Sequence, residues 1–387
     1  MIRSFKKASR IKKSIIIAAF ILIVFGLSGC ETVRFYRQAI KGQYQLIAGQ
    51  RPIDKLAANS NTEPRLRKQL QLVLELRGFA DKELKLPVDN HYRKYVDVHR
   101  PYVVWNVEAA PEFSMEPKSW WYPLVGRLEY RGYFSERAAQ QYAGTLRKKG
   151  YDVYIGGASA YSTLGWFKDP VLNTFVFDPE SDLAETIFHE LGHQRVFARG
   201  DTDFNEAFAT TVGQEGARRW LRAKGDTNAI ARYQAERQRN NDFVRLVMDA
   251  RKELETLYGD ERTEAGKIKA SKKPPAIPPD QLQQRKKAIF EQLRNRYAQV
   301  KAEWGGNSEY DHFFSRPINN AQLNSVAAYY DLVPGFEQLL KMNGDDLEKF
   351  YAAAENLSKR PKKERQQWLR TIGAGGSVVQ SQQLTRP

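Results

Sequence analysis

Two histidines and a glutamate within five residues carry the clearest chemical signal in this chain of 387 residues. The segment His189-Glu190-Leu-Gly-His193 holds two of only five histidines. On an α-helix, residues four apart lie on one face, so both imidazoles can reach one metal ion. Glu190 lies one step round the helix, where it can contact a water molecule on that metal without ligating it. This pattern indicates zinc-dependent hydrolysis of a peptide bond, with the carboxylate as the base.

The sequence around this motif predicts the helix that the chemistry requires. Apolar residues recur at helical spacing from about residue 180 to 198, and they are Leu183, Ile187, Leu191 and Phe197. Asp178 or Ser181 can cap this helix, with Pro179 near its first turn. The apolar run at 174–177 predicts a short buried strand just before it. A surface helix with two solvated or core-packed histidines is the alternative.

A third ligand is expected from the segment after the motif. Gly200 favours the end of the first helix, and the polar residues 201–203 can cap a second one. Glu206 would then lie in the first turn of that helix and could complete the metal site. An ordinary helix-dipole carboxylate is the alternative for Glu206. The competing carboxylates are Asp201, Asp203 and Glu215.

The only cysteine, Cys30, belongs to a second signal near the N-terminus. Residues 1–13 carry six Lys or Arg and no acid, residues 15–25 are apolar, and Leu-Ser-Gly-Cys follows at 27–30. Such a short apolar stretch is typical of a signal peptide and not of a membrane span. We expect cleavage before Cys30 and a lipid on its thiol, as in bacterial lipoproteins. An uncleaved anchor helix to about residue 29 is the alternative.

Either arrangement predicts a location in the bacterial cell envelope for residues 31–387. Glu31 follows the cysteine where an Asp would signal retention, which favours the outer membrane, facing the periplasm. The net charge is +16, and six of the positive charges belong to residues 1–29, which leaves +10. In this compartment, a basic surface favours anionic lipid over nucleic acid. No zinc-finger spacing or Gly-rich phosphate loop stands out, so we expect no nucleic-acid partner.

Composition predicts a globular protein, because 42% of the residues are hydrophobic and 12% are aromatic. The expected organisation is a signal peptide at 1–29, a helical region at 30–90, a catalytic region at 91–221, a helical hairpin at 222–304, a C-terminal helical part of the catalytic unit at 305–372 and a disordered tail at 373–387.

Local patterns predict the main elements of these regions. Within the first helical region, Tyr36, Ile40, Tyr44 and Ile47 recur at helix spacing. Strands are expected at 102–107 and 151–155, with a capped helix between them at 135–149 that Gly150 ends. Prolines at 274–275 and 278–279 interrupt the hairpin, which predicts a mobile tip there.

The chain resembles the bacterial putative aminopeptidase family, lipoprotein zinc peptidases of the HExxH Glu-zincin type. The matching segments extend over most of the mature chain, and they are 42–43, 105–110, 130–134, 160–170, 188–194, 200–209, 319–321 and 329–330. The resemblance implies a zinc-dependent peptidase with one Zn²⁺ per chain, ligated by His189, His193 and Glu206, with Glu190 as the base. The family pattern often has cysteines where this chain has Trp121 and Arg127.

Several further residues are candidates for supporting roles. Tyr329 or Tyr330 could donate a hydrogen bond to the developing oxyanion, with a packed core tyrosine as the alternative. The weaker candidates for this polar role are His312, Asn319 and Asn320. Asn205 and Asp201 could orient an imidazole through its second nitrogen.

Substrate contacts are harder to predict from the residues. The stretch 160–170 could pair with the substrate backbone, or flank the strand that does, and a packing loop is the alternative. An aminopeptidase also needs an acidic group for the substrate's ammonium, and Glu215 and Glu185 are merely nearby acids.

We therefore expect an α+β, zincin-like fold and a lipid-anchored zinc peptidase, with aminopeptidase activity on peptide substrates. An envelope endopeptidase is one alternative. A non-catalytic zinc-binding lipoprotein that binds a partner through the hairpin is the other, and the presence of Glu190 argues against it, because a structural zinc site has no use for that carboxylate.

Overall fold

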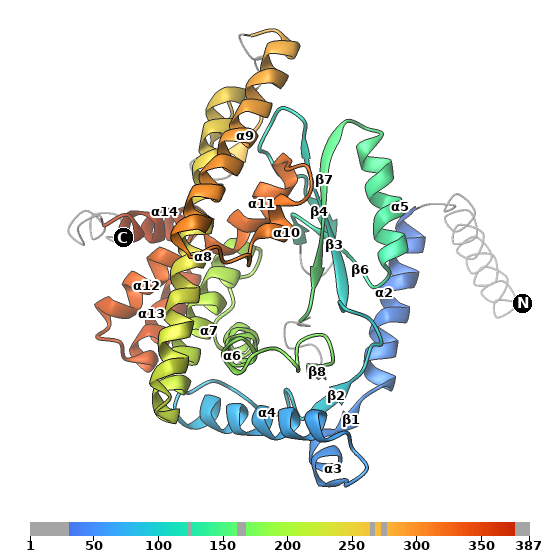
Figure 1. Cartoon of the computed structure of the whole chain (residues 1–387), viewed down its shortest axis with the longest axis vertical. Coiled ribbons are helices and arrows are strands. Elements are labelled where there is room, and N and C mark those ends of the chain that lie inside the picture. Colours follow the sequence, from blue (N-terminus) through green and yellow to red (C-terminus); the bar gives the residue numbers. More distant parts are fainter. Residues whose placement is uncertain (1–30, 123–125, 161–167, 264–267, 272–276, 376–387) are drawn as a thin grey trace, which may run out of the picture.

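The computed structural model describes residues 31–122, 126–160, 168–263, 268–271 and 277–375. Its architecture is mixed α+β, mainly helical with small sheets (Figure 1). Among the helices of this described part, none is both long and apolar enough to cross a bilayer. The predicted signal peptide, Cys30, the tip at Pro274 and Pro275 and the end of the predicted tail from residue 376 lie outside these residues.

A three-stranded antiparallel sheet separates the two sides of the molecule. Its order is β6 (Arg131–Tyr133), β3 (Val104–Pro111) and β7 (Tyr151–Ala158). The strands expected at 102–107 and 151–155 are confirmed, and both extend further. β3 and β7 pair along eight residues, from Val104 opposite Ala158 to Pro111 opposite Tyr151. Because side chains alternate along a strand, β3 presents different residues to the two sides.

Helices α2 (Glu31–Ala48) and α5 (Glu136–Arg147) cover one face of this sheet (Figure 1). Phe35 of α2 packs with Trp105, Val107 and Tyr133 in a small aromatic core. The expected helix at 135–149 is confirmed as α5, since the Ser135 hydroxyl accepts the N–H of Ala138 at 3.4 Å.

The other face of the sheet packs against α11 (Asn320–Tyr330). Asn320 is fully buried, and its Nδ2 donates to the carbonyls of Pro111, Glu112 and Ser114 at 3.0, 3.0 and 3.1 Å. Asn319 caps α11 by accepting the N–H of Gln322 at 3.0 Å. Asn320 therefore fixes α11 to the sheet and Asn319 starts the helix, and these contacts give no support to the oxyanion role considered from the sequence.

The largest hydrophobic core lies among the helices beyond the sheet. It joins α4 (Pro64–Lys82), α6 (Glu180–Arg195), α7 (Thr202–Lys224), α12 (Val333–Met342), α13 (Leu347–Ser358) and α14 (Lys362–Gly373). Short elements beside this core are α3 (Ile53–Ala58), β1 (Arg51–Pro52), β2 (Lys94–Val96) and β8 (Val171–Leu172). Strand β2 pairs antiparallel with β1 and parallel with β8.

Two long helices form the hairpin expected at 222–304, namely α8 (Thr227–Tyr258) and α9 (Pro279–Glu303). They enclose a second core in which Tyr297 stacks on Phe314 of α10 (Asp311–Phe314) at 4.0 Å between ring centroids. Leu323 of α11 belongs to the same core. The hairpin is thus packed onto the helices that follow it, and it is joined near its tip by β9 (Glu261–Arg262) and β10 (Ile268–Lys269).

A second small hairpin pairs Trp121 with Arg127, the two positions where the resemblance led us to compare with cysteines. Strands β4 (Trp120–Tyr122) and β5 (Gly126–Leu128) are antiparallel, with Trp121 directly opposite Arg127. Cysteines at such a cross-strand pair would lie near each other. Here, an exposed indole and a guanidinium occupy the two places, and neither belongs to the candidate site.

Three expectations around the metal motif are wrong in detail. Residues 174–177 form turns instead of a strand, because the N–H of Val176 bonds back to the carbonyl of Leu172 at 3.0 Å and the chain coils inside the core. Pro179 is the cap residue of α6, without a capping side chain, so neither Asp178 nor Ser181 serves. The helix ends at Arg195, before Gly200, and Phe197 lies beyond it and is exposed.

Candidate metal centre

His189, His193 and Glu206 converge on one point between α6 and α7. The Nε2 atoms of His189 and His193 lie 3.4 and 3.6 Å from the same Oε2 of Glu206. Within the described part of the chain, this is the only group of three whose potential ligand atoms all lie within 4.8 Å of one another. The structure thus brings together the three residues that the sequence and the resemblance indicated.

These separations fit a tetrahedral metal ion. Two metal–ligand bonds of about 2.0–2.1 Å that meet at a tetrahedral angle place their donor atoms about 3.3 Å apart. The two imidazole rings stand nearly perpendicular, at 88°, with centroids 4.9 Å apart, so their nitrogens approach the carboxylate from different directions. Two imidazoles and one carboxylate suit zinc, and they leave one position of a tetrahedron open.

The charges of Glu206 and the two imidazoles act strongly on one another. Burial raises the pKa of Glu206, but the two adjacent imidazoles outweigh it and hold that pKa below its ordinary range. For His193, burial lowers the pKa, and the Glu206 carboxylate outweighs this and raises it. Each partner therefore favours the charged form of the other, so a metal ion that binds the neutral imidazole must displace its proton.

Glu190 lies beside these residues, and one of its carboxylate oxygens has no hydrogen-bond partner. Its Oε2 is buried and accepts no hydrogen bond, and the same holds for Nδ1 of His193. Burial raises the pKa of Glu190, and the imidazoles of His189 and His193 partly offset that rise. These two atoms lie beside the converging ligands, where a bound group would satisfy them.

Two residues near Glu190 were not predicted from the sequence. Tyr92 and Asp169 are both buried and lie close enough to act on the Glu190 charge. Their backbones are joined, since the N–H of Tyr92 donates to the carbonyl of Asp169 at 2.8 Å. Asp169 ends the stretch 160–170 that was considered for substrate pairing, but residues 161–167 lie outside the described part. The buried ring of His91, whose Nδ1 accepts the N–H of Asp169 at 3.2 Å, holds this end in place.

Glycines let α6 and α7 approach closely enough for Glu206 to reach the histidines. These two helices pack together more extensively than any other pair of elements. A Cβ on Gly213 would lie 2.8 Å from the backbone oxygen of Glu185 and 3.1 Å from Cβ of His189. A Cβ on Gly192 would meet Ala209 and Val212 at 3.3 Å. The helix crossing, and with it the metal centre, therefore depends on the absence of a side chain at Gly213.

Replacing Gly213 with alanine is expected to lower zinc affinity as well as stability. The added methyl group must push α7 away from α6, at a cost of about 1–3 kcal/mol of unfolding free energy, and the shift moves Glu206 away from the imidazoles. Gly192→Ala is the matched control, because its milder contacts need a shift of only a few tenths of an ångström. Denaturant unfolding and zinc titration of both variants measure the effect, and equal zinc affinity in the two would contradict this explanation.

Asp201 and Asn205 position α7 and its preceding loop. Asp201 is buried and accepts from Nε of Arg365 at 2.7 Å and from Nε2 of Gln366 at 2.6 Å, both on α14. Asn205 makes two bonds with the backbone of Ala198, at 2.7 and 3.0 Å. These contacts go to α14 and to the backbone of Ala198, so they give no support to the orienting role expected from the sequence. They act on the site by fixing the helix on which Glu206 is the fifth residue, in the second turn and not the first.

The other acids considered from the sequence already have partners elsewhere. Glu215 accepts from Nε of Arg219 at 2.7 Å. Glu185 accepts from the Tyr233 hydroxyl at 2.6 Å and from Arg237 at 3.2 Å. Asp203 accepts from Gln366 at 3.2 Å. Like Asp201, these acids lie outside the group of three converging residues. Glu215 and Glu185 are already paired with arginines, so their contacts do not support binding of a substrate ammonium.

The oxyanion role expected for Tyr329 or Tyr330 stays a prediction. The Tyr330 hydroxyl lies 3.4 Å from Oδ1 of Asn240 on α8, and the side chain of Tyr329 lies outside the described part. His312 is exposed on α10. The contacts of Tyr330 and His312 therefore give no support to that role.

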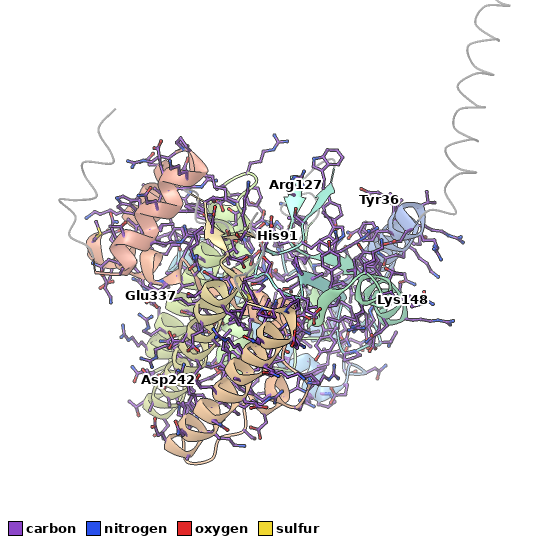
Figure 2. All side chains as sticks on the ribbon, turned by 90° about the horizontal axis from the view of Figure 1, so that it is seen from above. Tyr36, His91, Arg127, Lys148, Asp242 and Glu337 are labelled. Carbon is purple, nitrogen blue, oxygen red and sulfur yellow. The ribbon has the colours of Figure 1, made fainter. Side chains whose placement is uncertain are left out.

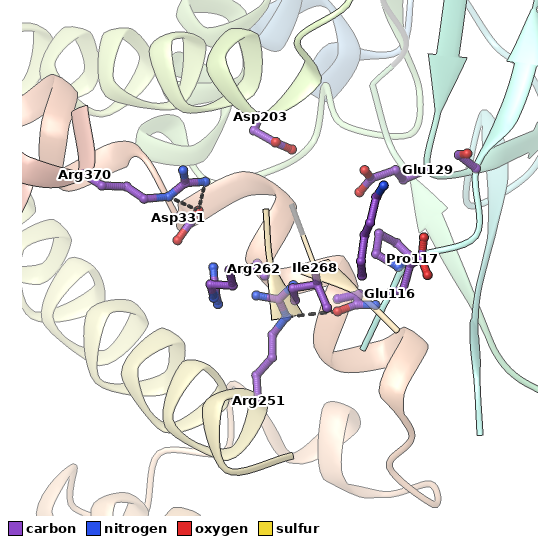
Figure 3. A pocket seen from close by; sticks show the side chains of 13 residues that line it. Glu116, Pro117, Glu129, Asp203, Arg251, Arg262, Ile268, Asp331 and Arg370 are labelled. Carbon is purple, nitrogen blue, oxygen red and sulfur yellow. Dashed lines mark hydrogen bonds and ion pairs between the residues drawn. The ribbon is translucent and has the colours of Figure 1, made fainter. Parts of the chain in front are cut away.

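A cleft leads away from Glu206 along the sheet. A small cavity of about 40 Å³ is bounded by Glu206, Thr202 and Asp203 of α7 and by Asn106 and Glu108 of β3. It shares Pro117, Glu129, Asp203 and Asn324 with an adjoining cavity of about 130 Å³. Residues of α8, α11 and α14 contribute to the lining of this second cavity (Figure 3). The residues of this second cavity include paired charges, such as Arg370 with Asp331 at 2.8 Å.

Sequence reasoning gave no role to Glu108, Glu129 or Tyr130, which line the cavity beside Glu206. A signal was present, since Glu108 and Tyr130 belong to segments that carry the family resemblance. Burial raises the pKa of Glu108 to about 8, and the nearby charge of Glu129 adds to this rise. The cavity thus holds a carboxyl group, Glu108, whose ionised form a bound cation would stabilise.

The fold and site define an α+β protein with a His-His-Glu constellation at the end of an acidic cleft. A family model described as "Putative aminopeptidase" matches residues 34–369. The match covers most of the chain, and this protein belongs to that family. The comparisons with curated proteins and with solved structures found no match.

Proposed function

We propose that this protein is a zinc-dependent aminopeptidase with a zincin-like fold that acts in the bacterial cell envelope. The observation that carries the proposal is the convergence of His189, His193 and Glu206 beside the unpartnered carboxylate of Glu190. The family description supports peptide-bond hydrolysis at the N-terminus of the substrate. The donor set and its tetrahedral spacing favour zinc.

In this proposal, His189, His193 and Glu206 hold the metal and Glu190 moves the proton. When bound, zinc supplies Lewis-acid polarisation of the scissile carbonyl and acidifies water. Glu190 then takes a proton from the attacking water at its free Oε2 and delivers it to the leaving amine. The surrounding core and the buried residues Tyr92 and Asp169 keep this carboxylate away from bulk water, so it has few competing partners.

The acidic cleft accounts for the preference for a free N-terminus. An ammonium group next to Glu108 and Glu129 would offset the burial and charge repulsion that raise the pKa of Glu108. The same cavity is bounded by Glu206, so an N-terminus held there lies next to the metal ligands.

Replacing Glu108 with glutamine is expected to lower kcat/KM for peptides with a free N-terminus by about 10–100-fold, since a charge-assisted hydrogen bond contributes about 1.5–3 kcal/mol. The N-acetylated form of the same peptide should be hydrolysed poorly by the parent and no worse by the variant. The measurement is the ratio of kcat/KM for free and acetylated peptides. Glu112→Gln is the matched control, because Glu112 follows β3 but is exposed and away from this cavity.

Two outcomes would count against the aminopeptidase assignment. If the parent cleaves acetylated and free peptides equally well, it is an endopeptidase. If Glu108→Gln loses activity equally on both substrates, Glu108 serves the reaction centre and does not bind the ammonium.

The envelope location is proposed from the sequence that precedes the described part. The basic segment 1–13, the apolar segment 15–25 and the residues Leu-Ser-Gly-Cys at 27–30 support a lipid on Cys30. Cys30 is the only cysteine, so a lipid on its thiol would leave the purified full-length chain unreactive towards maleimide. A chain that takes up one maleimide would contradict the lipid anchor.

A further inference from the structure

Helix α2 exposes a continuous apolar stripe. Tyr36, Ile40, Tyr44 and Ile47 retain 39, 70, 69 and 42% of their accessible surface. They make up half of the exposed large hydrophobic residues in the described part of the chain, and all of them lie on this one helix. At about 100° per residue, the four side chains fall within roughly 80° of one another around the helix. The predicted apolar periodicity of this segment is therefore real, but it faces outward.

The rotation of α2 is fixed by its inner face. Phe35, Gly42 and Leu46 are buried, and the Phe35 ring packs edge-on against Tyr133 at 5.4 Å. A Cβ on Gly42 would lie 2.1 Å from the ring of Phe134, so only glycine permits this contact. The apolar stripe cannot turn inward without breaking these contacts. Figure 2 shows Tyr36 at the periphery, on the same side of the molecule as Lys148 of α5.

Basic side chains lie beside the stripe on the same outward face. Helical geometry places Arg37, Lys41 and Arg34 roughly 100–160° from Tyr36, next to the apolar residues. All three are exposed, and within the described part none forms an ion pair. The outer surface of α2 thus combines tyrosine and isoleucine with a parallel row of positive charge. This composition is typical of a helix that lies in a membrane interface.

We propose that α2 lies flat on an anionic lipid bilayer, with Tyr36, Ile40, Tyr44 and Ile47 inserted at the level of the headgroups. Arg34, Arg37 and Lys41 then bind lipid phosphates. This proposal rests on the membrane attachment proposed at Cys30. Because α2 begins at Glu31, the next residue, a lipid on Cys30 would hold the stripe at the bilayer surface. The tether and the stripe act as two anchoring signals, and together they bind more stably than one.

This orientation places the bilayer and the cleft on opposite sides of the sheet. Phe35 of α2 packs on the face of β3 that carries Trp105 and Val107. Asn106 and Glu108 alternate with those residues, and they line the cavity beside Glu206 from the other face. The active cleft is therefore separated from the lipid by the sheet, and peptides reach it from the aqueous side.

Fluorescent probes on single cysteines of the full-length chain can test which surface meets the bilayer. The variants Ile40→Cys, Gln45→Cys and Met342→Cys place a probe on the stripe, on α2 beyond the basic row, and on the distant helix α12. The protein is reconstituted into vesicles of phosphatidylethanolamine and phosphatidylglycerol that carry brominated acyl chains as quenchers. We expect quenching several-fold stronger at position 40 than at 342, with position 45 between them.

A charge-insertion variant provides the complementary test. The double substitution Ile40→Glu and Tyr44→Glu changes only exposed positions, so the fold should be kept, as circular dichroism would verify. A probe introduced by Ile47→Cys should then be quenched no more than one at position 342, whereas without the two glutamates it should be quenched strongly. Phosphatidylcholine vesicles should also weaken quenching, because they lack net anionic charge.

Equal quenching at positions 40 and 342 would show that the stripe is not inserted in the bilayer and would overturn the proposal. The parent chain, with Cys30 alone, reports whether that thiol is free. If it takes up the probe, the lipid anchor is absent, and the three positions are then compared in a Cys30→Ser background. None of these measurements depends on peptide hydrolysis, so failure of the proposed enzymatic function would leave their outcome readable.

Discussion

Glu190→Gln is expected to lower kcat for peptide hydrolysis by about 10²–10⁴-fold, the usual contribution of a general base. Glutamine has nearly the same shape but cannot accept a proton at the position of the buried Oε2. Because Glu190 is not among the three converging ligands, the variant should still bind one zinc per chain. Metal analysis and steady-state kinetics on the same preparations of parent and variant measure both quantities.

Glu180→Gln is the matched control for this experiment. Glu180 lies on the same helix, but its carboxylate accepts from the Trp220 indole at 2.8 Å, away from the metal ligands. Parent-like hydrolysis by Glu190→Gln would show that another group acts as the base. Zinc in both proteins without hydrolysis of any peptide would favour a binding lipoprotein over an enzyme.

The second large effect is expected when a ligand is removed. His193→Ala should weaken zinc binding by more than about 100-fold, because loss of a direct ligand exceeds the 10–100-fold effect of disturbing an outer partner. Hydrolysis should be lost with the metal. In the parent, a chelator should abolish activity and added zinc should restore it, while the melting temperature rises with zinc because the metal binds only the folded chain.

A matched substitution separates ligand loss from general disturbance. Asp203→Asn changes a carboxylate of the same helix, but that carboxylate bonds to Gln366 and is not one of the converging three. It should therefore keep the zinc and the zinc-dependent rise in melting temperature. If His193→Ala retains stoichiometric zinc, or if Asp203→Asn loses it, the ligand assignment is wrong.

The sequence by itself determined the structural features that depend only on residues close together in the chain. The spacing of His189 and His193 puts both rings on one side of a helix wherever that helix packs, since the backbone geometry is local. The same holds for α5, where the cap Ser135 and the left-handed Gly150 mark the ends. It also holds for strands β3 and β7, which β-branched and aromatic residues predict. Local signals failed at residues 174–177, because apolar content predicts burial and burial is as compatible with turns as with a strand.

Only the tertiary structure decided which distant groups meet. Four carboxylates between residues 201 and 215 had the right chemistry for a third ligand. The close crossing of α6 and α7 at Gly213 brings Glu206 to the histidines. Asp201 and Glu215 instead bind Arg365 and Arg219. Glu108 is brought to the same place by strand pairing far along the chain. Periodicity likewise identified an apolar side of α2 but not its direction, because an outward face and an inward face have the same spacing. Only the packing of Phe35 and Gly42 against the sheet region settles it.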